Sequence, residues 1–381
     1  MSDNIRVGLV GCGGMGRYIA RLTQQQSNQV EICGLYDPDE NSVRRTRETL
    51  GKQIPAFDSI DGLLETDCQW VMIASWNAVH AEQTLAAFAA GKHVFCQKPL
   101  ATNLDDCLAM RSACRDSGRS FAIGFTLRYS PHYRKLKELI SGGVIGDVIS
   151  LEFNETLDFN HGGYIMGDWR RLAGNAGSHL LEKCCHDIDI VNWLVGSRAS
   201  RVSSFGGRNF FNPENEFHME RLGVDEQGRP AYQTWRGTVG ENPFTADKDI
   251  IDNQVVCMEF ANQVRATFHI NCNTAIPERR LYVCGTEGTI RSDVISGQLE
   301  LQRIGFDTRK EDHATGVSGM HGEGDAVLAA ELVATMMGSG EMSAGIDEGL
   351  ASAVTCFAID QAMATGQVVD LKDWWRRVDH E

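Results

Sequence analysis

The sequence predicts a two-domain α/β protein, in which a parallel sheet with helices is followed by an α+β domain with a mostly antiparallel sheet. Three observations support this fold class. The chain has 381 residues, more than a single hydrophobic core usually holds. Up to about residue 125, short apolar runs alternate with amphipathic stretches, as in βαβ units. Beyond about residue 145, strand patterns follow one another with few helices between them.

The first domain is expected to cover residues 1–125. Its predicted strands are short apolar runs, and its predicted helices carry apolar residues at helical spacing. The strands fall at 5–13, which ends in a glycine turn, and at 30–37, 70–75, 93–99 and 121–125. The helices between them fall at 15–26, 42–51 and 80–91. This order predicts a parallel sheet.

The second domain is expected to cover residues 126–381. Alternating apolar and polar residues indicate strands over 147–155, 255–271, 279–293 and 298–304. Residues 206–250 have no clear periodicity and are expected to form a long irregular insertion. Such loops are more often lids or binding loops than spacers. Four of its residues are therefore candidates for covering a larger substrate: Asn215, His218, Trp235 and Arg236.

The composition argues against several classes of protein. Nucleic-acid binding relies on clustered lysine and arginine, whereas this chain has a net charge of -15 and no basic run. No stretch reaches the roughly 18 apolar residues of a membrane-spanning helix, and the first residues do not resemble an export signal. The 12 cysteines lack CxxC spacing, which favours reduced, mostly buried thiols. We therefore expect a soluble cytoplasmic protein with no nucleic-acid or membrane partner.

A glycine motif lies between the first predicted strand and the first predicted helix. Gly11, Gly13 and Gly16 fit the pattern G-x-G-x-x-G. The first glycine permits a tight turn, the second lets the backbone approach a pyrophosphate, and the third allows close packing of helix on strand. The alternative is a tight turn with no ligand. The flanking strand and helix, together with an acid downstream, favour dinucleotide binding.

That acid is Asp37, which ends the second predicted strand about 20 residues beyond the motif. A carboxylate at this position accepts hydrogen bonds from the adenosine ribose and repels a 2′-phosphate. The sequence therefore favours NAD as the cofactor. Arg44 and Arg45 lie a helical turn or two downstream and leave NADP open as the alternative.

Lys98 stands just past the carboxyl end of a predicted buried strand and precedes Pro99. Ligands of open α/β sheets bind at this edge. The proline restricts Gln97 and Lys98, and the bond before it is a candidate for a cis peptide. An isolated lysine is usually a solvated loop residue. Beside a dinucleotide motif, Lys98 is a candidate active-site residue.

Motifs in a specific order run along nearly the whole chain. They are the glycine turn, CQKPLA at 96–101, and the segments 124–148, 168–196 and 282–290. In this order and spacing, the chain resembles the Gfo/Idh/MocA oxidoreductases, which include glucose-fructose oxidoreductase and inositol dehydrogenases. The resemblance implies a Rossmann domain followed by an open-faced sheet domain that commonly builds oligomer interfaces, here a homodimer or homotetramer. It also implies oxidation of a pyranose, glycoside or cyclitol with NAD or NADP.

The resemblance also assigns a cofactor side of the site. Lys98 matches the family's catalytic lysine, in a Glu-Lys-Pro triplet that is Gln97-Lys98-Pro99 here. The glutamine keeps hydrogen-bonding reach toward the nicotinamide ribose but removes a charge beside the ammonium. Asn77 matches a cofactor-side asparagine, and Trp169 with Arg170 matches an element close to the nicotinamide. The expected cofactor-binding residues are Gly11, Gly13, Gly14, Met15, Gly16, Asp37, Ser75, Asn77, His80, Gln97, Lys98, Trp169 and Arg170.

Residues 180–193 are expected to form a buried helix with a polar sector. At about 100° per residue, Glu182, His186 and Asp189 fall within one narrow sector. Oxidation of an alcohol by NAD needs a base for the hydroxyl proton, and histidine suits that task. A carboxylate one turn away can fix the tautomer of the histidine. By the resemblance, His186 and Glu182 match the family's catalytic histidine and aspartate, and Lys98 stabilises the alkoxide.

Three alternatives remain for this helix. Glutamate and histidine at i and i+4 with a third carboxylate are a possible zinc site, but hydride chemistry with a lysine needs no metal, and we predict none. A vicinal disulfide between Cys184 and Cys185 is disfavoured in a reducing compartment. A plain surface ion pair would contribute only about 0.3–0.5 kcal/mol. Asp189 is a candidate for a structural role, Cys184 is expected in the apolar face, and Lys183 and Asp187 are expected to pair with each other.

The expected substrate-binding residues include the catalytic set and three residues from neighbouring motifs. Arg128 lies in a segment that family members place near the site, and Asp168, like His161, flanks the WRR segment. His321 lies in a glycine-rich loop where the family contributes substrate contacts; a loop histidine with no role is the alternative. The full set is Lys98, Arg128, Asp168, Glu182, His186 and His321.

The leading functional hypothesis is an NAD(P)-dependent dehydrogenase of a secondary alcohol in a sugar, glycoside or cyclitol. One alternative is an NAD-dependent glycosidase that oxidises a hydroxyl transiently, eliminates the aglycone and returns the hydride. The histidine-rich motif expected of those hydrolases is missing, which favours the dehydrogenase. The other alternative is a non-catalytic NAD-sensing regulator, against which the presence of Lys98, His186 and Glu182 together argues.

Overall fold

The computed structural model describes residues 4–235 and 240–380. These residues divide into two compact units. The first consists of the chain up to Ser130 together with Glu323–Ala353, and the second of Pro131–Gly322 together with Val354–His380. The expected boundary differs from this division, because it placed all residues from 126 onward in one continuous domain.

The returning segment carries an apolar helix that completes the core of the first unit. Helix α11 (Gly324–Met336) buries Leu328 and Leu332 in the same cluster as Leu9 of the sheet. After this helix, the carbonyl of Ala344 accepts a hydrogen bond from the N–H of Ile123. The sequence indicates that the helix is apolar, but its pattern carries no information about which sheet it covers.

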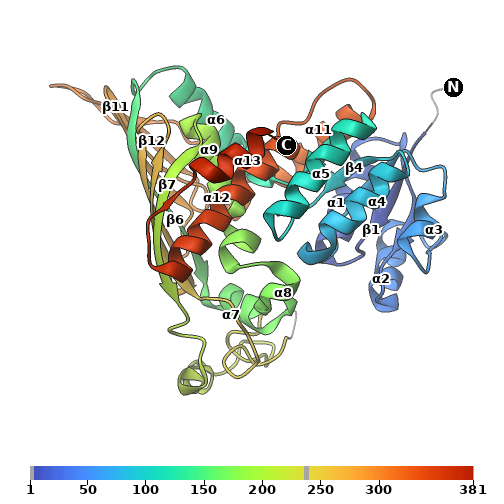
Figure 1. The fold of residues 1–381 in the computed structure, drawn as a ribbon. Helices are drawn as coiled ribbons and strands as arrows, with labels where there is room; N and C mark the ends of the chain where they lie inside the picture. Colours follow the sequence, from blue (N-terminus) through green and yellow to red (C-terminus); the bar gives the residue numbers. More distant parts are fainter. Residues whose placement is uncertain (1–3, 236–239, 381) are drawn as a thin grey trace. The chain divides into compact units, whose positions relative to one another are not determined.

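The sheet of the first unit has five strands in the order β2-β1-β3-β4-β5. All neighbours pair in parallel, as the alternation of strands and helices predicts. Its apolar side chains enter two clusters, one containing Val7 and Leu9 and the other containing Val71 and Ile73. Burial on both faces is typical of a parallel sheet flanked by helices. Figure 1 shows the helices that lie beside this sheet. The strands are β1 (Ile5–Val10), β2 (Val30–Tyr36), β3 (Trp70–Ile73), β4 (His93–Cys96) and β5 (Phe121–Ile123). The helices are α1 (Gly14–Gln26), α2 (Glu40–Leu50), α3 (Ile60–Leu64), α4 (His80–Ala89) and α5 (Leu104–Ser117), with 3-10 turns η1 (Asn77–Val79) and η2 (Thr126–Tyr129).

The second unit contains a nine-stranded sheet in the order β13-β12-β11-β10-β6-β9-β8-β7-β14. Strands β6 and β9 pair in parallel, and the other neighbours are antiparallel, so the mostly antiparallel sheet is confirmed. The long central strands are β6 (Val148–Asp158), β7 (Ala199–Gly207), β8 (Asn253–Phe260) and β9 (Arg265–Thr274). The others are β10 (Arg280–Gly285), β11 (Gly288–Asp293), β12 (Gln298–Arg303), β13 (Glu311–Asp312) and β14 (Val369–Asp370).

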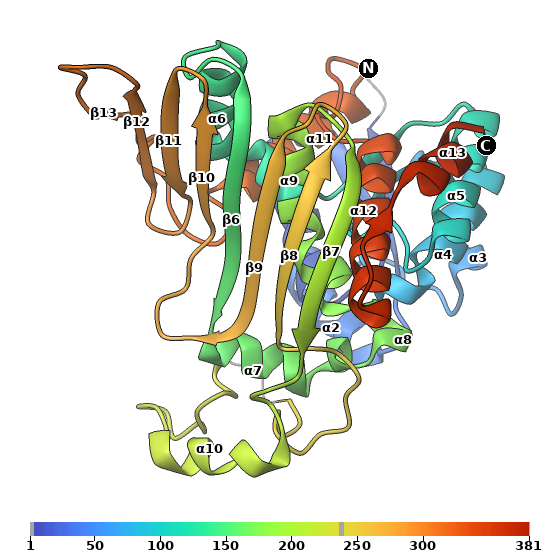
Figure 2. The ribbon, with the colours of Figure 1, turned by 60° about the vertical axis from the view of Figure 1, so that its left-hand side comes forward.

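Helices cover one face of this sheet, and Figure 2 shows α9 and α12 behind its strands. Helix α9 contacts β6, and α7 contacts β9. The opposite face carries exposed apolar side chains, among them Phe205, which is 70% exposed. The sheet is therefore open on one side. The helices are α6 (Pro131–Ser141), α7 (Phe159–Gly167), α8 (Ala173–Ala176), α9 (Cys185–Val195), α12 (Ile346–Thr365) and α13 (Lys372–His380), with a 3-10 turn η3 (Trp169–Arg171) and a π-helical turn η4 (Leu180–Cys184).

The connection from β7 to β8 is largely irregular, with a short turn η5 (Pro213–Asn215) and one short helix, α10 (Phe217–Leu222), among its described residues. It nevertheless has a hydrophobic core of its own. Phe211, Tyr232 and Phe244 cluster with Ile165 and Met166 of α7. The sequence indicates the irregularity but not this aromatic core, because neither helical nor strand spacing organises the residues that form it. Within the described part of the chain, no helix is long and apolar enough to cross a membrane.

Candidate active site

The glycine motif of the first unit forms a tight turn between β1 and α1. Gly11 has a φ of 88°, and a Cβ there would lie 2.4 Å from the backbone nitrogen of Ser75. A Cβ on Gly16 would lie 2.0 Å from the carbonyl oxygen of Gly11. Neither position therefore accepts a side chain without moving backbone.

Gly13 and Gly14 differ from these two glycines because they face open space. A Cβ at either position meets nothing within 4 Å among the described residues. Helix α1 begins at Gly14 without a side-chain cap and without an acidic residue in its first turn. The N–H groups at such a helix start suit the phosphates of a dinucleotide. Met15, expected beside the cofactor, is partly buried against the core of the unit.

Asp37 lies just after β2 and is held by two backbone donors. Its Oδ2 accepts a hydrogen bond from the N–H of Cys12 at 2.7 Å, and its Oδ1 accepts one from Asp39 at 2.8 Å. The carboxylate is therefore fixed against the glycine turn, where the ribose of a dinucleotide would reach it. Arg44 and Arg45 form exposed ion pairs along α2, with Glu48 and with Asp39 respectively.

Gln97 and Lys98 follow β4, and the bond between Lys98 and Pro99 is cis. Gln97 is 7% exposed, and its Nε2 has no hydrogen-bond partner among the described residues. A buried amide without a partner is uncommon in a folded protein. A ribose or carboxamide oxygen would provide the missing acceptor, so this side chain fits a bound nicotinamide nucleotide. Lys98 itself is partly exposed.

His80 was expected among the cofactor contacts, and in the structure its ring contacts backbone carbonyls of the same unit. The ring is fully buried, with Nδ1 2.9 Å from the carbonyl oxygen of Pro99 and Nε2 3.3 Å from that of Ser75. Burial lowers the pKa of His80 to about 4, so the ring is neutral at physiological pH. A neutral ring has one N–H, so His80 donates to only one of these two carbonyl oxygens, and its ring packs between the Lys98–Pro99 turn and Ser75.

The other expected residues of the first unit lie at the ends of its strands. Ser75 follows β3 and donates its hydroxyl to Oε1 of Gln83 at 2.5 Å. Asn77 is buried at the start of η1. Arg128 is buried in η2, where its Nη1 donates to the carbonyl oxygen of Ser343 at 3.2 Å. Arg128, expected to bind substrate, thus connects η2 to the returning segment.

In the second unit, Arg170 brings together several expected site residues. Its Nε lies 3.0 Å from Oε1 of Glu182, and its Nη1 lies 2.9 Å from Oδ1 of Asp168 and 2.9 Å from the hydroxyl of Tyr164. The guanidinium also lies over the ring of Trp169, 4.3 Å from its centroid. Charge-assisted bonds of this kind fix the geometry of a carboxylate. Trp169 and Arg170, expected beside the nicotinamide, are thus grouped with Glu182.

His186 and Glu182 lie on a helix that is not a regular α-helix throughout. Leu180–Cys184 form a π-helical turn, and α9 follows from Cys185. The sector expected for Glu182, His186 and Asp189 assumed α-helical spacing, and a π turn inserts an extra residue per turn. All three residues are at most 5% exposed. The ring of His186 lies near that of His321, with 5.9 Å between centroids, so the structure brings these two expected residues together.

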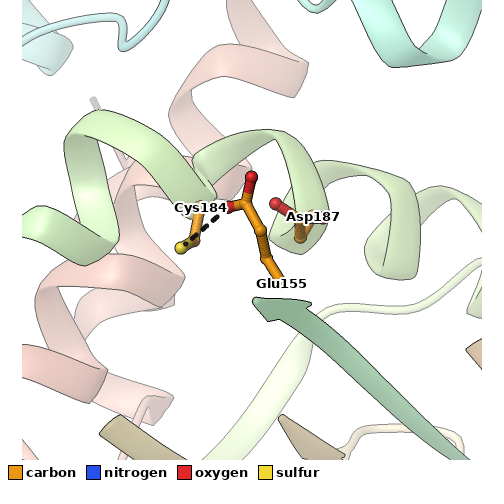
Figure 3. A group of neighbouring side chains, drawn as sticks. All are labelled: Glu155, Cys184 and Asp187. Atoms are coloured by element: carbon orange, nitrogen blue, oxygen red, sulfur yellow. Dashed lines mark hydrogen bonds between the residues drawn. The ribbon is translucent and has the colours of Figure 1, made fainter. Parts of the chain in front are cut away.

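The neighbours on this helix differ from the expectation. Lys183 pairs with Oε1 of Glu155 at 3.3 Å, and Asp187 pairs with Nε of Arg279 at 2.9 Å, so Lys183 and Asp187 have different ion-pair partners. Cys184, expected in an apolar face, donates its thiol to Oε2 of Glu155 at 3.2 Å. Figure 3 shows Glu155 reaching from β6 toward the helix.

Glu155 and Arg279 were not identified from the sequence, although a signal for them exists. In β6, Glu155 has the same parity as the buried Leu151 and Phe153. Arg279 precedes β10 in the same parity as the buried Leu281. Side chains of one parity point to one face of a strand, so both positions placed a charge on an otherwise apolar face. Such a charge requires an ionic partner.

Three acceptor atoms of Glu155, Cys184 and Asp187 lie within 4.8 Å of one another, a spacing that could hold a metal ion. Arg279 contacts both carboxylates, and Lys183 contacts Glu155. Two cations therefore already neutralise the two carboxylates of this group, and adding a metal ion would place like charges together in a buried site. The donor set does not fit a metal centre.

His161 stacks on Trp235, with 4.0 Å between ring centroids and 8° between ring planes. The insertion thus contacts α7, which also carries Tyr164 of the Arg170 group. Asn215 donates to the carbonyl oxygens of Asn209 and Phe210, and His218 stacks on Phe217. These two side chains support the insertion itself. Arg236 lies outside the described residues.

Two family models match the chain. Residues 5–125 match the oxidoreductase family with an NAD-binding Rossmann fold, and residues 137–371 match the C-terminal alpha/beta domain of the same oxidoreductase family. Together they cover both units except for the connection and the ends of the chain.

Curated relatives include oxidoreductases and an enzyme named as a hydratase. The 2,7-anhydro-N-acetylneuraminate hydratase of Escherichia coli is 26% identical over 333 residues, covering 85% of this chain and 79% of the relative. Inositol 2-dehydrogenase 3 of Saccharopolyspora erythraea is 38% identical over 197 residues, which is 50% of this chain and 54% of the relative. The inositol dehydrogenase match therefore spans only about half of either protein.

Among solved structures, a levoglucosan dehydrogenase in complex with NADH and levoglucosan aligns with a TM-score of 0.80, covering 97% of this chain and all of that one at 20% identity. A myo-inositol 2-dehydrogenase from Lactobacillus plantarum aligns with a TM-score of 0.74 over 97% of this chain, at 18% identity. At these identities the similarity establishes the fold.

Proposed function

The chain belongs to the Gfo/Idh/MocA family of NAD-binding oxidoreductases, and on this premise we propose that it is a dehydrogenase of a sugar, glycoside or cyclitol. The proposed reaction converts a secondary alcohol to a ketone. The hydride passes from carbon to the nicotinamide, and the hydroxyl proton passes to His186. The observation that carries the proposal is a glycine turn with open backbone at Gly13, together with the buried Glu182 and His186, in one chain of this family.

The first unit binds the cofactor in this proposal. The open backbone at Gly13 and the uncapped start of α1 receive the pyrophosphate. Asp37 accepts hydrogen bonds from the hydroxyls of the adenosine ribose, which favours NAD over NADP. The buried Gln97 amide donates to the nicotinamide nucleotide. When bound, NAD supplies the hydride acceptor, and the remaining steps belong to the side chains.

The proton chemistry depends on three side chains. Lys98 places a positive charge where the substrate oxygen becomes an alkoxide, so the negative charge that develops there is stabilised. His186 accepts the proton as general base. Glu182 supports the imidazolium that forms, and Arg170 holds the Glu182 carboxylate in place. The proposal requires Lys98 and His186 to act on the same substrate.

A turnover assay tests this proposal. The purified protein is incubated with NAD and a panel of hexoses, anhydro-sugars, glycosides and inositols, and NADH is measured by absorbance and the ketone by mass spectrometry. We expect NADH and ketone in equal amounts with at least one member of the panel. Tight NADH binding with no turnover of any compound would instead support a non-catalytic, NAD-sensing protein.

One observation favours a second candidate, in which the overall reaction is redox-neutral. The E. coli relative is named a hydratase, and hydration of a substrate leaves no net NADH. In this alternative, oxidation of one hydroxyl makes the neighbouring C–H acidic, and the leaving group on the next carbon is eliminated. Water then adds to the resulting double bond, and the hydride would return to the ketone. Formation of product without net NADH separates this alternative from the dehydrogenase.

We also propose that the open face of the nine-stranded sheet is a self-association surface, in a homodimer or homotetramer. Phe205, Ile149 and Val255 are each at least half exposed on this sheet. A hollow of about 650 Å³ lies on it, lined by residues of β6, β7, β8, β9 and β10. Large exposed apolar side chains on a sheet face are typical of a surface that a partner covers, so an identical subunit is the proposed partner. The proposed location is the cytoplasm.

A further inference from the structure

A buried ionic cluster lies between the sheet of the second unit and the helix that carries His186. It consists of Glu155 on β6, Arg279 just before β10, Lys183 in the π-helical turn and Asp187 on α9. The Lys183 side chain is 11% exposed, and the other three are at most 4% exposed. Buried charges persist only when each is paired. The cluster satisfies this condition, with two carboxylates against two cations.

The sheet brings its two members of the cluster together by strand register. In the antiparallel pair of β10 and β6, Leu281 lies opposite Phe153. Continuing that register by two residues on each strand places Arg279 opposite Glu155. Because residues two apart share a face, both side chains point to the face that carries the helices. Arg279 contacts Glu155 there and also donates to the carbonyl oxygen of Met320, beside His321.

The helix is attached to this pair at three points close to the proposed catalytic residues. Lys183 and Cys184 of the π-helical turn contact the two oxygens of Glu155, at 3.3 and 3.2 Å. Asp187 contacts Nε of Arg279 at 2.9 Å. Glu182 immediately precedes the first of these contacts, and His186 immediately precedes the last. The attachments therefore fix the backbone on which both proposed catalytic side chains stand.

The pKa values of the two carboxyl groups in the cluster shift in opposite directions. Burial raises the pKa of a carboxyl, but Arg279 and Lys183 outweigh burial at Glu155 and hold its pKa well below the usual range. At Asp187, burial and the charge of Glu155 together raise the pKa, and Arg279 offsets only part of this effect. Glu155 is thus the carboxyl of the cluster whose ionised form its partners favour. An ionised carboxylate suits an anchor for a lysine and a thiol donor of the same turn.

π-helical turns are rare and occur frequently at functional sites. We propose that Glu155 and Arg279 are positioning residues for the proposed reaction, because their contacts hold the π-helical turn Leu180–Cys184 and the start of α9 in the form that presents Glu182 and His186. This inference rests on the proposed function. It predicts an effect on the proton-transfer step and none on the cofactor, since the cofactor residues of the first unit take no part in the cluster.

A double-mutant cycle on the full-length protein tests the proposal. Glu155→Gln keeps the size of the side chain and removes its charge, and we expect kcat to fall about tenfold or more, as for a displaced catalytic group. The dissociation constant of NADH should not change. In a His186→Asn background, Glu155→Gln should cause no further loss of kcat, because its effect acts through His186. Equal losses of kcat in both backgrounds would overturn the proposal and leave Glu155 a stability residue.

A milder pair of variants guards against misfolding. Cys184→Ser keeps a donor for Glu155 in a side chain of similar size, and Cys184→Ala removes the donor together with the sulfur atom. We expect Cys184→Ser to retain most of the wild-type kcat and Cys184→Ala to lose several-fold more, with the same NADH affinity in both. Equal kcat in the two variants would contradict the proposal. Arg279→Lys adds a second check, because one ammonium cannot serve Glu155 and Asp187 as a guanidinium does.

NMR provides a readout that does not depend on turnover. The ring resonance of His186 is assigned by its loss in His186→Asn, and that of His80 in the first unit serves as the internal control. Glu155→Gln should shift the His186 resonance and leave His80 unchanged. An unshifted His186 overturns the positioning role, whatever the activity. A shifted His186 in a protein that turns over no substrate supports the positioning role and overturns only the proposed function.

Discussion

Arg170 holds the carboxylate of Glu182, with 3.0 Å between Nε and Oε1. The same guanidinium reaches Asp168 and the hydroxyl of Tyr164 and lies over the ring of Trp169. Arg170 therefore orders one wall of the proposed substrate site within the second unit. The resemblance places Arg170 beside the nicotinamide, and the structure adds its ion pair with Glu182.

Arg170→Met is expected to lower kcat about tenfold or more, because Glu182 loses the group that orients it. It should also lower the free energy of unfolding by about 1–3 kcal/mol, since a largely buried carboxylate is left without its charged donor. Urea unfolding and steady-state kinetics measure the two effects. Arg376→Met is the control, because the ion pair of Arg376 with Asp373 is exposed and contributes little. Similar kinetics for the two variants would exclude Arg170 from the site.

Gly13→Ala is expected to weaken NADH binding without reducing thermal stability. A methyl group at Gly13 meets nothing within 4 Å in the described structure, so its only obstacle is the approaching pyrophosphate. Gly174→Ala, in α8, is the matched control, because it also faces open space but lies in the other unit. Titration followed by NADH fluorescence measures the affinity, and a melting curve measures the thermal stability. Unchanged NADH affinity in Gly13→Ala would place the cofactor elsewhere.

The sequence was sufficient to predict the parallel sheet, the glycine turn and the position of Asp37 at the end of the second strand, because each depends on residues close together in the chain. The pairing of Glu155 with Arg279 joins residues that are distant in sequence, and no local pattern indicates which distant charge a buried carboxylate will meet. The return of α11 to the first unit was missed for the same reason. Local periodicity identifies a buried helix but not its partner.

The helix of residues 180–193 was predicted, but its detailed geometry was not. A sector calculated at 100° per residue assumes an α-helix, whereas Leu180–Cys184 form a π-helical turn. His80 likewise was expected to contact the cofactor, whereas its ring is buried beside the carbonyl oxygens of Pro99 and Ser75. In both cases the tertiary contacts of the side chains, which the sequence does not contain, decided the outcome.

Stability should depend on pH through Asp360, on α12. Burial raises the pKa of Asp360 to about 7, and the hydrogen bond from Ser178, 2.6 Å away, offsets only part of this. The folded carboxyl therefore binds its proton more tightly than the unfolded one. As a result, the free energy of unfolding should fall as the pH rises from about 4 to about 7.

Asp360→Asn removes this pH dependence. At pH 8 the variant should melt at a higher temperature than the wild type, with a free energy of unfolding larger by an amount on the order of a few kcal/mol. At pH 4 the two proteins should melt at nearly the same temperature. Asp373→Asn, at an exposed position of α13, should change neither melting temperature. A stabilising effect of Asp360→Asn that is equal at both pH values would contradict the assignment.

Phe205→Glu is expected to disrupt self-association. Phe205 is 70% exposed on β7, and a carboxylate there would be buried without a partner in an interface between copies. Size-exclusion chromatography with light scattering should give a dimer or tetramer for the wild type and a smaller species for the variant. Phe306→Glu alters a fully exposed phenylalanine beyond the end of β12 and should leave the assembly intact. A monomeric wild-type protein would contradict the proposed role of this surface in self-association.

The central claim is that Lys98 and His186 act together on a substrate alcohol that NAD oxidises. Its most direct test compares NADH formation by the wild type, Lys98→Met and His186→Asn with a turned-over sugar or cyclitol, at saturating NAD and with NADH affinity measured in parallel. We expect both variants to lose kcat by about 100-fold or more, as for groups that take part in proton transfer and charge stabilisation, and we expect His186→Asn to bind NADH as the wild type does. Wild-type turnover in either variant would contradict the central claim.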